Sequence, residues 1–256
     1  MDKWADKYDI DVEIVLINDY IEGINQYTAG AFDAVGATNM DALSIPAGGG
    51  VDTTALIVGD YSDGNDAIII KGEGDITSLK GETVNLVELS VSHYLLARAL
   101  ASVGLSERDL EGQFKKTDDE MIAASAQDEV THLVTRTPMA AEILQDPNAN
   151  CVYDSSDIPG EIVDIMWANT EVLEANPAFG KAVAGAWFEV MELMASGDEE
   201  VLTAMAEASG TDLEGYKAQL AATEMFYTPA EAVAFTESEE LKTTMVSVAE
   251  FLFENG

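Results

Sequence analysis

The chain of 256 residues is long enough for one large or two modest domains, and its 47% hydrophobic content can supply a substantial core. Its 48 acidic and 12 basic residues give a net charge of −36, which excludes nucleic acid as a partner because neutralising phosphates requires clustered lysine and arginine. The sequence has no apolar run of transmembrane length, and its single cysteine excludes a disulfide framework.

The acidic residues are spread along the chain rather than gathered in a tail, so we expect them to cover the surface of a folded protein. Like charges at this density repel one another and destabilise a compact state at low ionic strength. At about 1 M salt the screening length falls to roughly 3 Å, and most of this penalty disappears. The composition therefore indicates a saline habitat, and it argues against docking on an anionic membrane surface.

The first part of the chain alternates short apolar runs with helical patterns. Residues 11–17, DVEIVLI, alternate apolar and polar positions and predict a strand, and residues 19–28 predict a helix that Gly30 stops. A second helix is predicted to start at Thr38, in a polar cluster that follows a short strand. Further strands are predicted at residues 32–37, 53–58 and 67–71.

Residues 85–101, NLVELSVSHYLLARALA, predict a strand, a tight turn and a helix that Ser90 or Ser92 can cap. A strand that leads into a capped helix is half of a parallel βαβ unit, and the ligands of such sheets collect beyond the carboxyl ends of the strands. This stretch places Glu88, both serines and His93 at such an end. The alternative is that the serines only cap the helix, that Glu88 is solvated and that His93 is a capping or packing residue.

The second part of the chain continues the alternation as far as residue 169 and is then helical to its end. Strands are predicted at residues 130–135, 151–153 and 162–169, and helices at residues 118–126 and 138–144. Alternating strands and helices favour an α/β fold with mainly parallel sheets. We expect one lobe of residues 1–71 and 166–256 and a second of residues 72–165, with a ligand cleft between them. Such a pair of lobes is typical of a hinge-closing binding protein.

The turns that we expect to face this cleft carry mostly acidic and polar side chains. They are Asp19, Asn39, Asp41, Asn65, Asp66, Glu88, Ser90, Ser92, His93, Arg136, Glu161 and Asp164. The start of a helix favours an anion by only about 0.3–1 kcal/mol, whereas a hydrogen bond to a carboxylate contributes roughly 1.5–3 kcal/mol. Arg136 is the only basic residue in the set, so the contribution of the carboxylates exceeds that of the helix starts. The set therefore favours a small cationic or donor-rich ligand such as guanidinium or urea. The alternative for each acid is a solvated surface group.

Signatures of catalysis are missing from the sequence. It has no nucleophile elbow, no dinucleotide fingerprint and no HExxH motif, and its two isolated histidines form no metal pair. We therefore expect no catalytic residues, no metal and no cofactor, and the chain is predicted not to be an enzyme.

Six stretches carry a resemblance to a known family. They are INDYIEGINQYTAGAFDAV, TNMDALSIPA, GNDAIIIKG, LKGETVNLVELSVSHYLLARAL, PGEIVDIMWANTEVL and MFYTPAEAVAFT. They resemble the substrate-binding proteins of ABC transporters, in the nitrate, taurine and alkanesulfonate class that also includes thiamine-precursor binders. Within that class the chain is most similar to the group encoded beside urea carboxylase, described as urea-type and linked to guanidine uptake. NLVELSVSHYLLARAL and PGEIVD are specific to this group.

This resemblance implies a two-lobed Venus-flytrap fold of type II in an exported protein that is periplasmic or extracytoplasmic. It also implies a monomer that delivers its ligand to an ABC permease and does not insert into the membrane. Relatives carry a leader, a strand and most of a helix before the segment matching residues 3–8, so the resemblance also implies that this chain lacks the first strand of the fold. Relatives have an aromatic residue in place of Arg136, where an arginine can stack on a planar ligand or form a salt bridge.

Other ligands and one enzyme remain alternatives under the same resemblance. A nitrate, sulfonate or pyrimidine-precursor binder has the same fold, and so does a pyrimidine-precursor synthase that uses its own histidine and a pyridoxal cofactor. The synthase needs a lysine for a Schiff base in a cleft. Lys71 and Lys80 instead lie near the expected hinge and in a turn, away from any phosphate-binding cluster.

The net charge of −36 predicts a strong dependence of stability on salt. Because exposed like charges are screened at high ionic strength, we expect the thermal midpoint to rise substantially between dilute buffer and molar sodium chloride. Differential scanning calorimetry over a salt series measures the effect. A midpoint that stays flat or falls would mean that the acids are already compensated.

Overall fold

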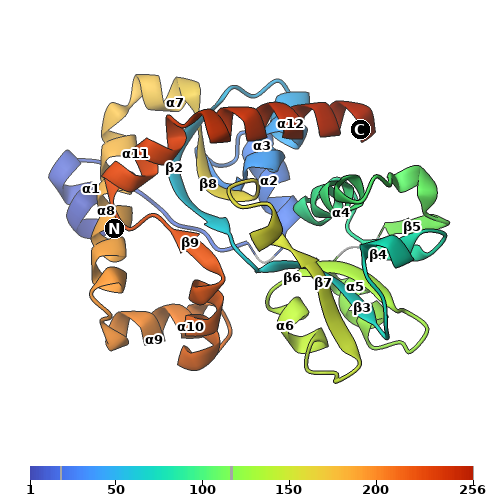
Figure 1. The fold of residues 1–256 in the computed structure, drawn as a ribbon. Helices are drawn as coiled ribbons and strands as arrows, with labels where there is room; N and C mark the ends of the chain where they lie inside the picture. The colour runs from blue at the N-terminus through green and yellow to red at the C-terminus, as the bar shows by residue number, and fades with distance from the viewer. Residues whose placement is uncertain (18, 116–117, 256) are drawn as a thin grey trace. The chain divides into compact units, whose positions relative to one another are not determined.

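The computed structural model describes residues 1–17, 19–115 and 118–255, and it divides into two compact units. The first unit consists of Met1–Tyr61 and Val163–Ala249, and the second of Ser62–Ile162 and Glu250–Gly256. Figure 1 shows the chain coloured from blue at the N-terminus to red at the C-terminus, with most helices and strands labelled. Because the chain passes between the units more than once, each unit joins segments that are distant in sequence.

The first unit is built on a four-stranded sheet with the order β1-β8-β2-β9. Its strands are β1 (Ala34–Thr38), β2 (Thr53–Ser62), β8 (Val163–Asn169) and β9 (Thr223–Met225). β8 runs antiparallel to both β1 and β2, with Asp164 opposite Asp60 in the β2–β8 register. A strand from the later part of the chain therefore completes a sheet begun by the first two strands.

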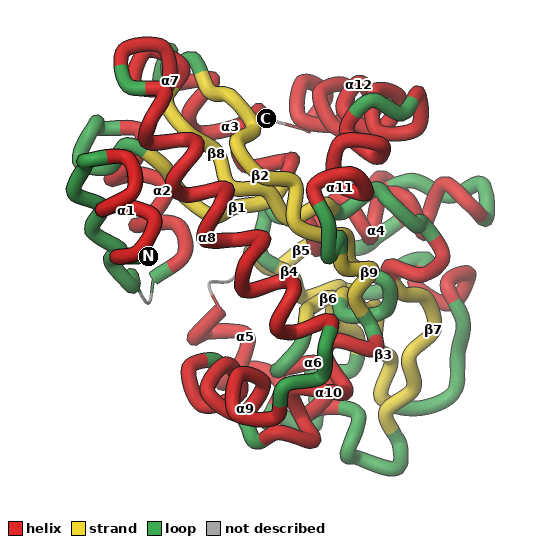
Figure 2. The backbone as a smooth tube through the Cα atoms, turned by 90° about the vertical axis from the view of Figure 1, so that its left-hand side faces the viewer, coloured by secondary structure: helices red, strands yellow, loops and turns green. Residues whose placement is uncertain are grey.

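Helices of the first unit pack on this sheet and on one another. They are α1 (Asp2–Tyr8), α2 (Tyr20–Thr28), α3 (Asn39–Gly48), α7 (Thr170–Ala175), α8 (Pro177–Ala195), α9 (Glu199–Ala208), α10 (Leu213–Ala221), α11 (Pro229–Thr236) and α12 (Glu239–Asn255), whose last residues belong to the second unit. Phe188 of α8, a long helix in Figure 2, packs against the core around Val58 and Ile165. A separate apolar cluster joins α8 to α9 and α10 through Met191 and Leu202. Among the described helices, none has the length and hydropathy needed to cross a bilayer.

The second unit is built on a five-stranded sheet with the order β5-β4-β6-β3-β7. The strands are β3 (Asp66–Lys71), β4 (Thr83–Leu86), β5 (Gly112–Lys115), β6 (His132–Arg136) and β7 (Ala149–Asp154), and the helices are α4 (Val91–Ser102), α5 (Asp118–Ser125) and α6 (Met139–Ile143). β4 runs parallel to β5 and β6, whereas β3 runs antiparallel to β6 and β7. Ile68 and Ile69 of β3 are fully buried, as expected for an unbroken apolar run between two neighbouring strands.

One predicted strand is wrong. Residues 11–17 have no regular structure, and Ile14 and Leu16 are 79% and 84% exposed. The alternating pattern gives this segment the side chains of a strand, but a strand also needs a neighbour whose backbone accepts and donates its hydrogen bonds. In the described sheets no strand pairs with this segment.

Three further expectations about the sheets are corrected. The sheets are mixed rather than mainly parallel, because β8 and β3 each run antiparallel to both of their described neighbours. β3, which we assigned to the first lobe, pairs with β6 and β7 and so belongs to the second unit. The end of the chain is not wholly helical either, because β9 adds a short strand to the first sheet. Local patterns locate several of the strands but do not specify which strands pair.

Gly185 allows α1 to approach α8 closely, which gives a test of this packing. A Cβ atom added at Gly185 would overlap the ring of Trp4, whose indole Nε1 donates to Glu189 Oε2 at 2.5 Å. We expect Gly185→Ala to lower the free energy of unfolding by about 1–3 kcal/mol, as overpacking does. The matched control is Gly48→Ala in α3, where an added Cβ meets nothing within 4 Å. Urea denaturation compares the two, and equal stability in both variants would contradict the α1–α8 contact.

Candidate functional site

The predicted site residues of the first unit are engaged in fixing helix starts. Asp41 is buried near the start of α3, and its Oδ2 accepts from the Thr38 N–H at 2.8 Å, the Thr38 hydroxyl at 2.6 Å and the Tyr20 hydroxyl at 2.5 Å. Burial, followed by the charge of Asp41, raises the pKa of Tyr20, so the phenol keeps its proton and donates it. Asp41 therefore links the starts of α2 and α3.

The side chains of Asn39 and Asp19 each accept a hydrogen bond from a backbone N–H group. Asn39 is buried, and its Oδ1 accepts from the Val163 N–H at 3.2 Å, which ties the start of α3 to β8. Asp19 is exposed and caps α2 by accepting from the Glu22 N–H at 2.9 Å. The predicted helix starts at residue 19 and at Thr38 are thus found in the structure, while a role of Asp19 and Asn39 in ligand binding stays a prediction.

Asp164, which we predicted in a turn facing the cleft, lies within β8 and pairs across the sheet with Asp60 of β2, which was not predicted. Asp60 faces Asp164 in the strand register, and the two side chains share a hydrogen bond, which requires one proton between them. Burial and the neighbouring Asp164 raise the pKa of Asp60 to about 8. Asp60 was missed because the predicted strand ends at residue 58, whereas β2 extends through Asp60 to Ser62.

In the second unit, Asp66 at the start of β3 is the centre of a buried polar cluster. The side chain is 4% exposed, and its Oδ2 accepts from the Ser62 hydroxyl at 2.7 Å. The Ser155 hydroxyl lies 2.7 Å from that of Ser62 and accepts from the Gly64 N–H at 2.7 Å. Ser155 was not predicted, because a serine in a polar loop gives no sign in the sequence that it is buried.

The other oxygen of Asp66 sets this residue apart. Oδ1 is buried and has no hydrogen-bond partner among the described residues. Burial raises the pKa of Asp66, whereas the hydrogen bond from Ser62 and the charge of Arg136 lower it. Arg136 faces Asp66 in the β3–β6 register, and Asn65 directly precedes Asp66 in the chain. Three of the predicted residues are therefore brought together here.

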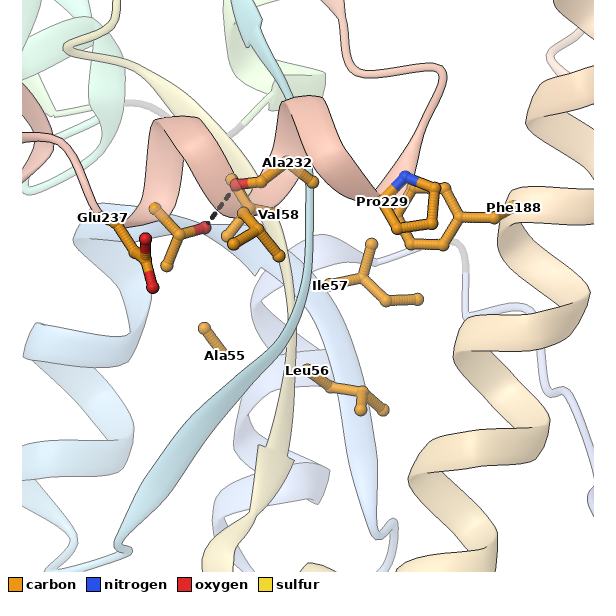
Figure 3. A pocket seen from close by; sticks show the side chains of 10 residues that line it. Ala55, Leu56, Ile57, Val58, Phe188, Pro229, Ala232 and Glu237 are labelled. Carbon is orange, nitrogen blue, oxygen red and sulfur yellow. Dashed lines mark hydrogen bonds between the residues drawn. The ribbon is translucent and has the colours of Figure 1, made fainter.

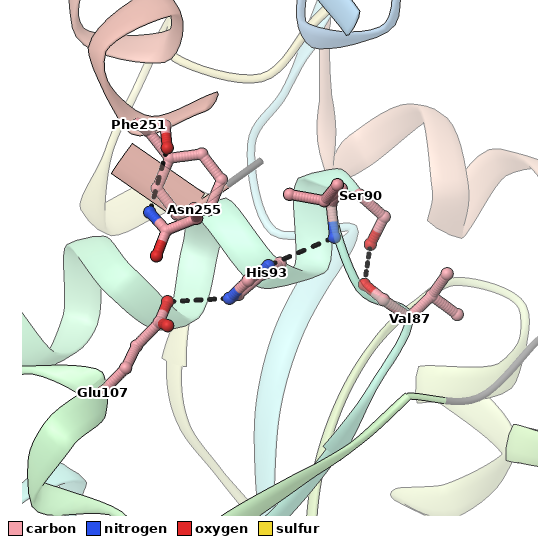
Figure 4. Close-up of polar contacts among 7 residues, drawn as sticks. Val87, Ser90, His93, Glu107, Phe251 and Asn255 are labelled. Carbon is pink, nitrogen blue, oxygen red and sulfur yellow. Dashed lines mark hydrogen bonds and ion pairs between the residues drawn. The ribbon is translucent and has the colours of Figure 1, made fainter. Parts of the chain in front are cut away.

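The turn between β4 and α4 holds four more predicted residues, as Figure 4 shows in part. Glu88 is half-buried and Ser92 is buried. The Ser90 hydroxyl donates to the Val87 carbonyl at 2.6 Å and does not cap α4, contrary to one of the two caps expected. His93 is buried, with Nδ1 accepting from the Leu89 N–H at 3.1 Å and Nε2 at 2.7 Å from Glu107 Oε1.

Glu161 forms an ion pair that the sequence analysis did not anticipate. Arg98 of α4 donates through Nε to Glu161 Oε2 at 2.7 Å and through Nη2 to Oε1 at 2.8 Å, and the Tyr94 hydroxyl donates to Oε2 at 2.6 Å. Tyr94 and Arg98 therefore tie Glu161 to α4, and they supply donors to both oxygens of its carboxylate. Within the described part of the chain, no three acidic, histidine or cysteine side chains are placed to hold a metal ion.

A separate apolar hollow of about 320 Å³ lies in the first unit (Figure 3). Residues Ala55–Val58 of β2, Phe188 of α8 and residues of α11 line the hollow. Pro229 and Glu237 lie at opposite sides of it. None of the predicted site residues lines it. Its apolar walls offer little to the charged or donor-rich ligand that the polar clusters favour.

The Asp60–Asp164 pair predicts a pH dependence of stability. Between about pH 4, where an unfolded aspartate ionises, and about pH 8, folded Asp60 keeps a proton that the unfolded chain has released. This group therefore lowers the free energy of unfolding as the pH rises through that window. Asp60→Asn cannot ionise, so the stability of the variant relative to the unaltered protein should increase from acid to mildly alkaline pH. Urea denaturation in constant molar salt measures this, with the exposed Asp33→Asn as control; a difference that does not change with pH would contradict the shared proton.

No family model and no curated protein matches this sequence, but solved structures do match its fold. The chain is similar to the periplasmic aliphatic sulphonate-binding protein SsuA of Escherichia coli, with a TM-score of 0.81 and 20% identity over 99% of this chain and 81% of that one.

It is also similar to the alkanesulfonate-binding protein SsuA of Xanthomonas axonopodis pv. citri bound to MOPS, with a TM-score of 0.72 and 19% identity over 96% and 86% of the two chains. The Candida albicans CA3427 gene product, whose family has the generic periplasmic binding protein fold, matches with a TM-score of 0.67 and 13% identity over 99% and 88% of the chains. The likeness shows that this chain has the mixed α/β fold of the periplasmic binding proteins.

Proposed function

We propose that this chain is the substrate-binding component of an ABC importer, which captures a small donor-rich nitrogen compound outside the cytoplasm and delivers it to a membrane permease. The observation that carries the ligand class is the buried Asp66 carboxyl group, whose Oδ1 has no partner among the described residues. The fold shared with sulfonate-binding proteins supports the binding role. Guanidinium and urea are the ligands that we favour.

The preference for guanidinium follows from the cost of burying a carboxylate. Burying a hydrogen-bond acceptor without a partner destabilises the protein by roughly 1–3 kcal/mol, and by more when the acceptor is charged. A guanidinium group would supply planar N–H donors and a positive charge to the vacant oxygen. Because burial raises the pKa of Asp66, a cation would also favour its ionised form, so guanidinium binding should weaken as the pH falls. Urea supplies donors without the charge.

A sulfonate is the second candidate, and it rests on a different observation. The side chain of Ser90 does not cap α4, so the first N–H groups of that helix lack the cap that the sequence predicts. Arg136 adds a positive charge in the same unit, and two proteins of similar fold are named for sulfonates. A helix start contributes only about 0.3–1 kcal/mol to binding an anion, so we rank this candidate below the cationic one.

Calorimetric titration of Asp66→Asn and Glu88→Gln against guanidinium, urea, nitrate and taurine separates the candidates. Removing a buried charged partner should weaken guanidinium binding by about 2–5 kcal/mol, whereas urea binding should weaken by only about 1 kcal/mol. An oxyanion should bind more tightly when either negative charge is removed. Glu73→Gln, at an exposed position after β3, is the control and should change nothing.

Two results would contradict the proposal. Unchanged guanidinium and urea binding in both variants would exclude the cationic site, and tighter binding of taurine would establish the second candidate. The ligand recovered from the complex should also be chemically unchanged by mass spectrometry. Turnover of guanidine, urea or a pyrimidine would show that the chain is an enzyme instead.

A further inference from the structure

The turn from β4 to α4 contains a backbone conformation that needs support. Leu89 has a φ of +54°, in the left-handed region that a leucine seldom adopts, because its Cβ crowds the following carbonyl oxygen. Such a residue persists only where its surroundings hold it. The turn carries Glu88 and Ser90 on either side of Leu89, so the conformation of Leu89 decides where both side chains point.

His93, in the first turn of α4, supplies that support. The residue is 2% exposed, its Nδ1 accepts from the Leu89 N–H at 3.1 Å, and its Nε2 lies 2.7 Å from Glu107 Oε1 (Figure 4). An imidazole nitrogen that accepts a hydrogen bond carries no proton, so the neutral ring has its proton on Nε2, the nitrogen that lies beside the Glu107 carboxylate. Phe251 packs edge-on against the ring with the centroids 5.1 Å apart.

The two ring nitrogens of His93 therefore contact Leu89 and Glu107, which both belong to the second unit. We propose that His93 is a positioning residue that holds Leu89 left-handed through Nδ1 and thereby places Glu88 and Ser90 for ligand binding, while Glu107 selects the tautomer that leaves Nδ1 as an acceptor. This rests on the proposed binding function. It replaces direct contact between His93 and the ligand, which the sequence analysis predicted.

Two substitutions divide the functions of the ring. In His93→Asn the side-chain Oδ1 takes the place of Nδ1 and still accepts from Leu89, but the contact with Glu107 is lost. In His93→Gln the longer amide reaches toward Glu107 and no longer accepts from Leu89. Both variants remove the aromatic contact with Phe251, so packing alone predicts similar effects in the two.

Amide hydrogen exchange at Leu89 and calorimetric titration with guanidinium, urea and taurine provide the readouts. We expect His93→Asn to keep both the protection of the Leu89 amide and the affinity close to those of the unaltered protein. In His93→Gln we expect Leu89 to exchange at least about tenfold faster and the affinity to fall by about tenfold, as the loss of one hydrogen bond predicts. Nitrogen-15 shifts of the unaltered imidazole should show the proton on Nε2.

Equal losses in the two variants, or a greater loss in His93→Asn, would overturn the proposal and leave His93 a packing residue. If the unaltered protein binds none of the three compounds, the proposed function is what fails. Exchange at Leu89 still decides in that case: a difference between the variants supports the role of His93 in the turn, and no difference overturns it.

Discussion

The enclosure of β3 between two neighbouring strands is the constraint that buries the Asp66 carboxyl group in the second unit. β3 lies between β6 and β7, and its fully buried isoleucines fix the strand in the middle of the sheet, so that Asp66 at its start is enclosed as well. Ser62 donates to one carboxyl oxygen, the Ser155 hydroxyl contacts that of Ser62, and Arg136 on the next strand favours the charged form. The enclosed but incompletely bonded carboxyl group is what a donor-rich ligand would complete.

Other acidic residues show by contrast why Asp66 is distinctive in so acidic a chain. Asp41 is saturated by hydroxyl and amide donors, Glu161 by a bidentate arginine and a tyrosine, and Asp60 by a proton shared with Asp164. Each of these groups holds two segments of the protein together. Charge and position in the sequence could not separate them from Asp66, because the distinction lies in the partners that tertiary structure supplies.

Much of the fold could be predicted from the sequence because caps and apolar periods are local. The strand–turn–helix at residues 85–101 and the helices after residue 169 are confirmed by β4, α4 and the helices from α7 onward. Strand pairing is not local, and this explains why residues 11–17 form no strand and why β3 belongs to the second sheet. Of the candidate site, the polar residues at strand ends were predicted, whereas Ser155, Arg98 and Glu107 depend on contacts distant in sequence.

A crystal structure of the protein soaked with guanidinium tests the central claim most directly. We expect a guanidinium nitrogen at about 3 Å from Asp66 Oδ1, where the described residues supply no donor. Guanidinium bound elsewhere, with Oδ1 of Asp66 still lacking a partner, would contradict it.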